Sequence, residues 1–136
     1  MRLKLAAGLG LAGTSALLLL AATAGAHHSH GNYVDTFMDI EGVVTEVHLI
    51  NPHSWIYLEV VDAGGQPALW SLEATSRIGL ERIGVTSDAL QPGDRIKVRC
   101  HPLRDGSRGC LLGFVKLSDG SITDWDGNDL PIPTDL

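Results

Sequence analysis

Apolar and polar residues alternate along two neighbouring stretches of the chain. In the first stretch, 43–50, the odd positions carry Val, Thr, Val and Leu, whereas positions 46 and 48 carry glutamate and histidine. In the second stretch, 54–62, the even positions from 56 to 60 are apolar and the odd ones are aromatic or acidic. A period of two is typical of strands with one buried face and one wet face. The pattern therefore predicts two strands that pair as a hairpin.

The Asn-Pro-His turn between these strands carries a candidate site. Pro52 fixes its own φ and keeps Asn51 out of the helical region, so the first strand must end there. Asn51 can hydrogen-bond its own backbone and begin the turn. Aromatic residues of the second strand would then share an exposed face with the histidine of the first. The candidate ligand-binding residues are His48, His53, Trp55 and Tyr57. A plain polar turn residue is the alternative interpretation of His53.

The remaining elements follow in an order that is typical of an OB-type barrel. We expect strands over 40–50, 54–62, 68–74, 95–101 and 110–117, and a short helix that Ser76 caps and that ends near Ile83. The predicted fold is all-β with minor α content, a five-stranded OB-like barrel with one short helix. Closure suits a small domain because it removes exposed strand edges. An open sandwich of similar strands is the alternative.

The beginning of the chain has the pattern of a secretory signal peptide. Arg2 and Lys4 precede an apolar run to about residue 22, and small residues at 22–26 allow cleavage after Ala24 or Ala26. The run is short for a membrane span, and no positive stop follows it. We therefore expect residues 1–26 to be removed and the mature protein to lie in the periplasm without a membrane anchor.

The mature chain divides by composition into three parts. Residues 27–38 are polar and unpatterned and predict a flexible His-rich arm. The barrel is expected over 39–118. The acidic C-terminal tail, 119–136, is expected to run over the surface.

The charge of the mature chain is strongly negative. Two of the ten basic residues fall in the signal peptide, which leaves eight against sixteen acidic residues and a net charge of −8. We therefore expect no nucleic-acid partner and no attraction to anionic lipid. A basic stripe at Arg95, Lys97 and Arg99 is expected to lie on the wet face of a strand and to pair with acidic residues such as Glu41 and Glu46.

Cysteine usage agrees with export. Cys100 and Cys110 are the only cysteines, and the residues between them form a predicted hairpin turn around Asp105, which would put the two opposite each other. An oxidising compartment allows them to form a disulfide. A loop of this length contributes about 2.5–3 kcal/mol in the chain-entropy description.

Five motifs occur in a fixed order. They are an Ala-His-His-Ser start (26–29), a Gly-x-Val-x-x-Val strand (42–47), Asn-Pro-His-x-Trp-Ile (51–56), a Gly-Leu-x-Arg-x-Gly helix (79–84) and a Leu-x-Pro-Gly-Asp strand entry (90–94). With this set, nearly the whole mature chain resembles a family of uncharacterised exported bacterial proteins. That family is known as a domain of unknown function, so the resemblance implies the fold and export and no particular activity.

Imidazole side chains gather at the expected mature N-terminus. With His27 first, its amine and ring can chelate copper together. With Gly25 first, the terminal amine, two amides and an imidazole form a square-planar copper or nickel site. His53 could add a fixed ligand on which the arm closes. The candidate metal ligands are His27, His28, His30 and His53. A solvated arm that is merely rich in histidine is the alternative.

The sequence contains no recognisable catalytic arrangement. Ser54 is only a sequence neighbour of His53, and no nucleophile elbow, phosphate-cradling loop or dinucleotide fingerprint occurs. We expect a protein that is not an enzyme, and three hypotheses remain. The first is an exported, non-catalytic binding module for an unknown small ligand. The second is a small periplasmic copper-binding protein. The third is an accessory subunit of a larger exported enzyme, with Trp70 or Trp125 as anchor.

We expect the exported protein to lack its first 24 or 26 residues and to contain no free thiol. The reasons are the signal pattern and the cysteine pair. Intact-mass measurement of the periplasmic protein, before and after thiol labelling under native conditions, tests both points. Retention of residues 1–26, or labelling of both cysteines, would contradict the prediction.

Overall fold

The computed structural model describes residues 30–136, and His30 only through its backbone. The expected signal peptide and the candidate ligands His27 and His28 therefore lie outside the described residues. The elements are η1 (His30–Asn32), β1 (Met38–His48), β2 (Ser54–Val61), β3 (Pro67–Ala74), α1 (Arg77–Arg82), β4 (Arg95–Pro102), β5 (Gly109–Lys116) and β6 (Ile122–Asp124). Among these residues, no helix is long and apolar enough to cross a membrane.

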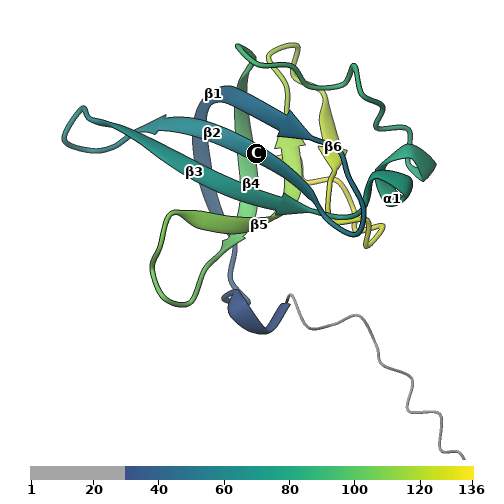
Figure 1. Cartoon of the computed structure of the whole chain (residues 1–136), viewed down its shortest axis with the longest axis horizontal. Coiled ribbons are helices and arrows are strands. Elements are labelled where there is room, and N and C mark those ends of the chain that lie inside the picture. The colour runs from purple at the N-terminus through teal and green to yellow at the C-terminus, as the bar shows by residue number, and fades with distance from the viewer. Residues whose placement is uncertain (1–29) are drawn as a thin grey trace, which may run out of the picture.

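The strands form one sheet that closes on itself. Their order is β3-β2-β1-β4-β5-β6, and a parallel pairing of β3 with β5 completes the barrel. Figure 1 shows the β2–β3 hairpin projecting from one side of the barrel and α1 lying at the other. The prediction of an OB-like five-stranded barrel with one short helix is confirmed, and β6 is an additional strand.

The β1–β2 hairpin forms as predicted, with one change of face. A β-bulge between Val44 and Glu46 leaves Thr45 without a partner in β2. Because the bulge inserts one residue, it reverses the alternation, and Val44 rather than Val43 is buried in the core. The hydroxyl of Thr45 donates to the carbonyl oxygen of Tyr57 at 3.2 Å. The regular period read from the sequence could not show this reversal.

The core fills the barrel and is closed at one end by α1. Its buried members include Val44, Ile56, Leu58, Leu72, Leu80, Val98, Leu112 and Trp125. The predicted cap of α1 is confirmed, because Oγ of Ser76 accepts a hydrogen bond from the backbone N–H of Gly79 at 3.0 Å. Leu80 is the residue of α1 that enters the core.

The C-terminal segment packs into the barrel rather than running only over its surface. β6 pairs with β5, and Trp125, which follows β6, is 1 % exposed. The backbone N–H of Trp125 donates to Gly113 at 2.8 Å, and its carbonyl accepts from Thr75 at 3.0 Å. The barrel therefore does not end at residue 118. Its burial also means that Trp125 cannot anchor a partner protein.

The basic stripe on β4 is paired with carboxylates, as expected for a wet strand face. Arg95 lies 3.3 Å from Glu41, and Arg99 donates two hydrogen bonds to Asp39 at 2.8 and 2.9 Å. The Arg99 guanidinium holds the pKa of Asp39 below its ordinary value. The predicted pairing with Glu46 is wrong, because Glu46 contacts His48 on β1 instead.

The disulfide between Cys100 and Cys110 is confirmed, with 5.7 Å between the two Cα atoms. The cysteines are not directly opposite each other, because Cys100 is in register with Leu112 and Cys110 with Pro102. The difference arises because the register of β4 with β5 centres their connection on Gly106, one residue after Asp105. The bond thus joins β4 and β5 diagonally.

We expect Leu58→Asp to lower the free energy of unfolding by about 3–5 kcal/mol or to prevent folding, because it places an unpaired charge in the core. The neighbouring Glu59→Lys, on the exposed side of the same strand, should change it by less than about 0.5 kcal/mol. Urea unfolding followed by circular dichroism measures both. Equal stabilities of the two variants would contradict the assigned faces of β2.

Candidate functional site

Three of the predicted site residues lie together on the outer face of β1 and β2. His48 is in register with Trp55, and the rings of His48 and Tyr57 meet edge to face with centroids 5.7 Å apart. The strand residues that alternate with them, Ile56 and Leu58, are fully buried. The barrel wall therefore holds the aromatic side chains outward on a rigid support.

His53 lies next to this face, in a turn that is tied to the start of α1. The carbonyl oxygen of Ile50 accepts hydrogen bonds from the backbone N–H of Arg77 at 2.9 Å and from the Ser54 hydroxyl at 3.3 Å. Oδ1 of Asn51 accepts from the N–H of Ile78 at 3.4 Å, so this residue contacts the helix rather than its own backbone. The turn is therefore held by hydrogen bonds from α1 and from the first residue of β2.

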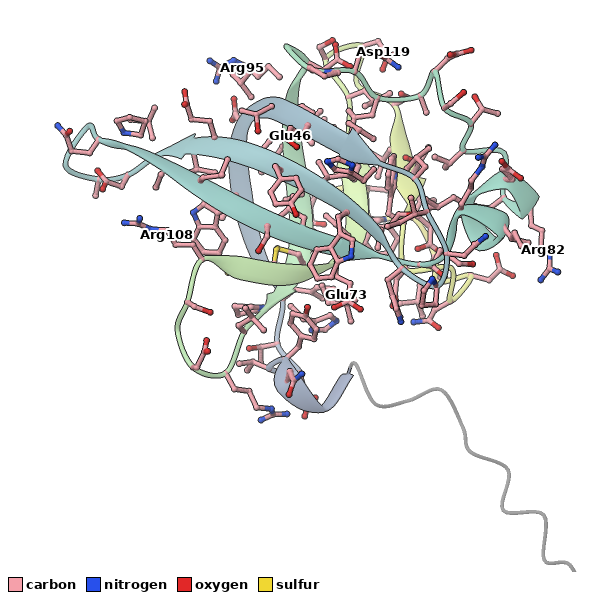
Figure 2. All side chains as sticks on the ribbon, viewed as in Figure 1. Glu46, Glu73, Arg82, Arg95, Arg108 and Asp119 are labelled. Carbon is pink, nitrogen blue, oxygen red and sulfur yellow. A yellow bond between two sulfur atoms is a disulfide. The ribbon has the colours of Figure 1, made fainter. Side chains whose placement is uncertain are left out.

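The sequence analysis missed the central residue of the site, Glu73. It lies on β3, in register with Trp55 on β2 and with Leu111 on β5, and it is only 7 % exposed. Oε2 accepts a hydrogen bond from the Tyr33 hydroxyl at 2.6 Å, and Oε1 lies 3.0 Å from Nδ1 of His53. Both carboxylate oxygens thus have partners. Figure 2 shows Glu73 on the side of the sheet that faces the segment after η1.

Tyr33 reaches Glu73 because the chain before β1 docks on the connection between β4 and β5. Tyr33 forms a bridge with Leu103, and the N–H of Val34 donates to Pro102 at 2.9 Å. Nδ1 of His101 lies 2.9 Å from the carbonyl oxygen of Val34. The described part of the predicted flexible arm is therefore attached to the barrel, and Tyr33 is 6 % exposed. Figure 1 shows η1 beside the β4–β5 connection.

Burial and the neighbouring carboxylate have an electrostatic consequence for Tyr33. Loss of hydration, followed by the hydrogen bond and the charge of Glu73, raises the pKa of the Tyr33 hydroxyl well above its ordinary value of 10.0. The phenol therefore stays protonated and remains a donor to Glu73 throughout the neutral range.

The described residues do not by themselves build a metal centre. No group of three or more histidine, cysteine, aspartate or glutamate side chains within the described part of the chain could hold a metal ion. His48 instead contacts Glu46, with 2.9 Å between Nε2 and Oε2, and the two side chains are 49 % and 63 % exposed. The aromatic face is thus flanked by two carboxylates, one exposed and one buried.

Comparison with known proteins identifies the family of the chain. The sequence model of DUF6152, a family of unknown function, matches residues 16–112. The chain belongs to this family. No curated protein matches it.

Two solved structures have a similar fold. Both are crystal structures of Rim1, a mitochondrial single-stranded DNA-binding protein from S. cerevisiae. The first has 10 % sequence identity and a TM-score of 0.47, and the match covers 61 % of this chain and 93 % of Rim1. The second, labelled with selenomethionine, has 10 % identity and a TM-score of 0.44, with coverages of 60 % and 92 %. At this identity the likeness concerns the fold alone.

The net charge of the chain does not exclude a nucleic-acid partner, and the prediction that it does is wrong. Both similar structures are described as single-stranded DNA-binding proteins. Net charge averages over the whole chain, and it opposes only the non-specific attraction to phosphates. It does not decide what one face of the barrel binds.

We expect Tyr33→Phe to lower the free energy of unfolding by about 1–2 kcal/mol, because it leaves one buried oxygen of Glu73 without its donor. The raised pKa of Tyr33 adds stability that is fully present below pH 10.0 and is lost as the pH rises through the higher value in the folded protein. The free energy of unfolding of Tyr33→Phe should therefore lack the decrease that Tyr33 causes above pH 10.0.

Urea unfolding between pH 7 and 11, together with ultraviolet titration of tyrosine, measures both effects. Tyr57→Phe, on the outer face, is the matched control and should change the unfolding free energy at pH 7 by less than about 0.5 kcal/mol. If Tyr33→Phe changes the free energy of unfolding as little as Tyr57→Phe does, the hydrogen bond from Tyr33 to Glu73 does not stabilise the fold.

Proposed function

We propose that this protein is an exported, non-catalytic binding module of the periplasm. Its binding surface is the outer face of β1 and β2 with the adjoining turn, formed by His48, His53, Trp55 and Tyr57. The single observation that carries this proposal is the edge-to-face cluster of aromatic rings on strands whose opposite face is the barrel core. Aromatic side chains held rigidly at a surface bind ligands with little loss of conformational entropy.

Two features support the exported, non-catalytic part of the proposal. The disulfide between Cys100 and Cys110 suits an oxidising compartment, in agreement with the signal pattern at the beginning of the sequence. Ser54, the only hydroxyl beside His53 in sequence, is fully buried and donates to Ile50. It is therefore not available to act as a nucleophile.

The charges around the rings favour one class of ligand. Glu46 contacts His48, and Glu73 is in register with Trp55. Carboxylates beside aromatic rings attract cations, and the ring faces add a cation–π contribution of about 0.5–1 kcal/mol at exposed sites. The ligand proposed for this face is accordingly a small cationic or uncharged molecule with a planar or apolar part.

An exported protein partner is the alternative occupant. The face continues along the β2–β3 hairpin to Val61 and Leu69, which are 65 % and 56 % exposed. Both lie on the projecting hairpin (Figure 1), away from the turn that holds His53. An accessory subunit would use these apolar residues, whereas a small-ligand module would use the aromatic cluster.

We expect a cationic tripeptide, tri-arginine, to shift the indole N–H signal of Trp55 in nitrogen-15 spectra, whereas tri-glutamate should not. Trp125 is an internal reference, because its indole N–H is bonded to Thr123 at 2.8 Å and its ring is buried. Trp55→Ala should weaken tri-arginine binding at least tenfold, about 1.4 kcal/mol, and the matched control Leu69→Ala should not.

An unmoved Trp55 signal with both probes would overturn the proposed face. Equal weakening by Trp55→Ala and Leu69→Ala would also count against it, since the hairpin end would then take part in binding.

A further inference from the structure

The imidazole ring of His53 has one nitrogen engaged and the other available to a ligand. Its Nδ1 lies 3.0 Å from Oε1 of Glu73, and the two side chains are 41 % and 9 % exposed, respectively. A carboxylate that carries no proton only accepts hydrogen bonds, so in the neutral imidazole this contact places the proton on Nδ1 and the lone pair on Nε2. No other group in the described part of the chain is hydrogen-bonded to this ring. Nε2 can therefore accept a hydrogen bond from a ligand.

This acceptor lies on the same side of the sheet as the aromatic rings. Ser54 is fully buried, so its neighbours in the chain, His53 and Trp55, both turn their side chains to the outer face. Glu73 is in register with Trp55, which places it diagonally across from His53, within the reach of a long side chain. A ligand that stacks on the Trp55 indole therefore lies next to the imidazole.

The orientation of the imidazole is fixed from two directions. The other oxygen of Glu73 accepts from the Tyr33 hydroxyl at 2.6 Å, and β3 is paired with β2 on one side and with β5 on the other. The turn that carries His53 is held through Ile50 and Asn51. The acceptor is thus in place before a ligand arrives, and binding does not have to order it.

The negative charge of Glu73 is not balanced by a basic side chain. Its two partners are a hydroxyl and an imidazole, and no lysine or arginine of residues 31–136 forms an ion pair with it. Asp39, in contrast, is paired with the Arg99 guanidinium. A charge that is partly removed from water acts more strongly on its surroundings. The position beyond Nε2 therefore favours a cation.

We propose that Nε2 of His53 accepts a hydrogen bond from the charged group of the ligand, and that the aromatic face selects organic cations with an N–H, such as primary ammonium or guanidinium groups, over fully N-methylated ones. Glu73 is the positioning residue, because it sets the tautomer and the orientation of the ring. The inference rests on the proposed binding face and names the class of ligand that this face takes.

The distinction between the two kinds of cation follows from what each can offer to His53. Both carry a positive charge, so both interact with the ring faces and with the carboxylates. A trimethylated nitrogen has no proton to donate, and a ligand that covers Nε2 without donating to it removes the water that otherwise does so. A site that is built to accept a hydrogen bond rejects a ligand that lacks the donor for this reason.

His48 does not provide a second acceptor of this kind. Its Nε2 lies 2.9 Å from Oε2 of Glu46, but the two side chains are 49 % and 63 % exposed and belong to the same strand. Water competes for an exposed contact, so this contact does not fix the tautomer of the ring. The selection between cations should therefore depend on His53.

The experiment compares benzylammonium with benzyltrimethylammonium, which share the aromatic ring and the charge. The indole N–H signal of Trp55 in nitrogen-15 spectra reports the binding of each. The unaltered protein should bind benzylammonium at least tenfold more tightly, about 1.4 kcal/mol. His53→Ala should reduce this preference to less than twofold. The preference itself is the readout, because a merely structural role of His53 would weaken both cations equally.

Glu73→Gln tests the positioning role. The amide of glutamine can donate to Nδ1, so the proton is no longer held there and the preference should fall below about threefold. Glu59→Gln is the matched control, because it removes the same charge from an exposed position of β2 and should keep the tenfold preference. Thermal unfolding of each variant verifies that it is folded.

Nitrogen-15 spectra of the histidine rings provide a second measurement that needs no variant. At pH 8 we expect His53 to carry its proton on Nδ1, and its Nε2 signal to shift when benzylammonium is added. A proton on Nε2 of the free protein, or an Nε2 signal that does not move, would overturn the inference. A preference that persists in His53→Ala would overturn it as well.

The tri-arginine titration separates this inference from the proposed function. If tri-arginine shifts the Trp55 signal while the two benzyl cations bind equally or not at all, the role of His53 is rejected and the binding face stands. If none of the three probes shifts the Trp55 signal, both are rejected.

Discussion

The parallel pairing of β3 with β5 is the constraint on which the rest of the structure depends. It brings Glu73 beside Leu111 and closes the sheet into a barrel. Tyr33 is held by the connection between β4 and β5, so it can reach a residue on β3 only because the barrel is closed. The disulfide reinforces the same region, since Cys110 is in register with Leu72 across this pairing.

The two histidine–carboxylate contacts differ in strength because one carboxylate is exposed and the other is buried. The contact of His48 with Glu46 is exposed, so water and salt screen it and its contribution is small. Glu73 is buried and bonded to Tyr33, so its charge acts in a medium of lower effective dielectric constant. The aromatic face thus lies between an exposed carboxylate and a buried one, and the buried one orients His53.

The local elements were predictable because their causes are local. A period of two on either side of the Asn-Pro-His turn indicated the β1–β2 hairpin. Ser76, a residue type that caps helices, indicated the start of α1, and the cysteine spacing indicated the disulfide. The bulge at Thr45 was not predictable, because it follows from the way β1 leaves β4 and pairs with β2. The same applies to Trp125, whose burial depends on the pairing of β6 with β5 and on the backbone hydrogen bond from Thr75, fifty residues earlier in the chain.

By itself, the sequence determined five of the six strands, which side chains of β2 face outward, and which histidines and aromatic rings are available. These properties depend on neighbours a few positions apart. Only the tertiary structure decided that Glu73 is buried, because its donor Tyr33 is forty residues away and reaches it through barrel closure. It also decided that His53 is held at Nδ1, since that contact needs β3 beside the turn. These contacts depend on the pairing of strands that are far apart in the sequence, and local residue spacing does not predict that pairing.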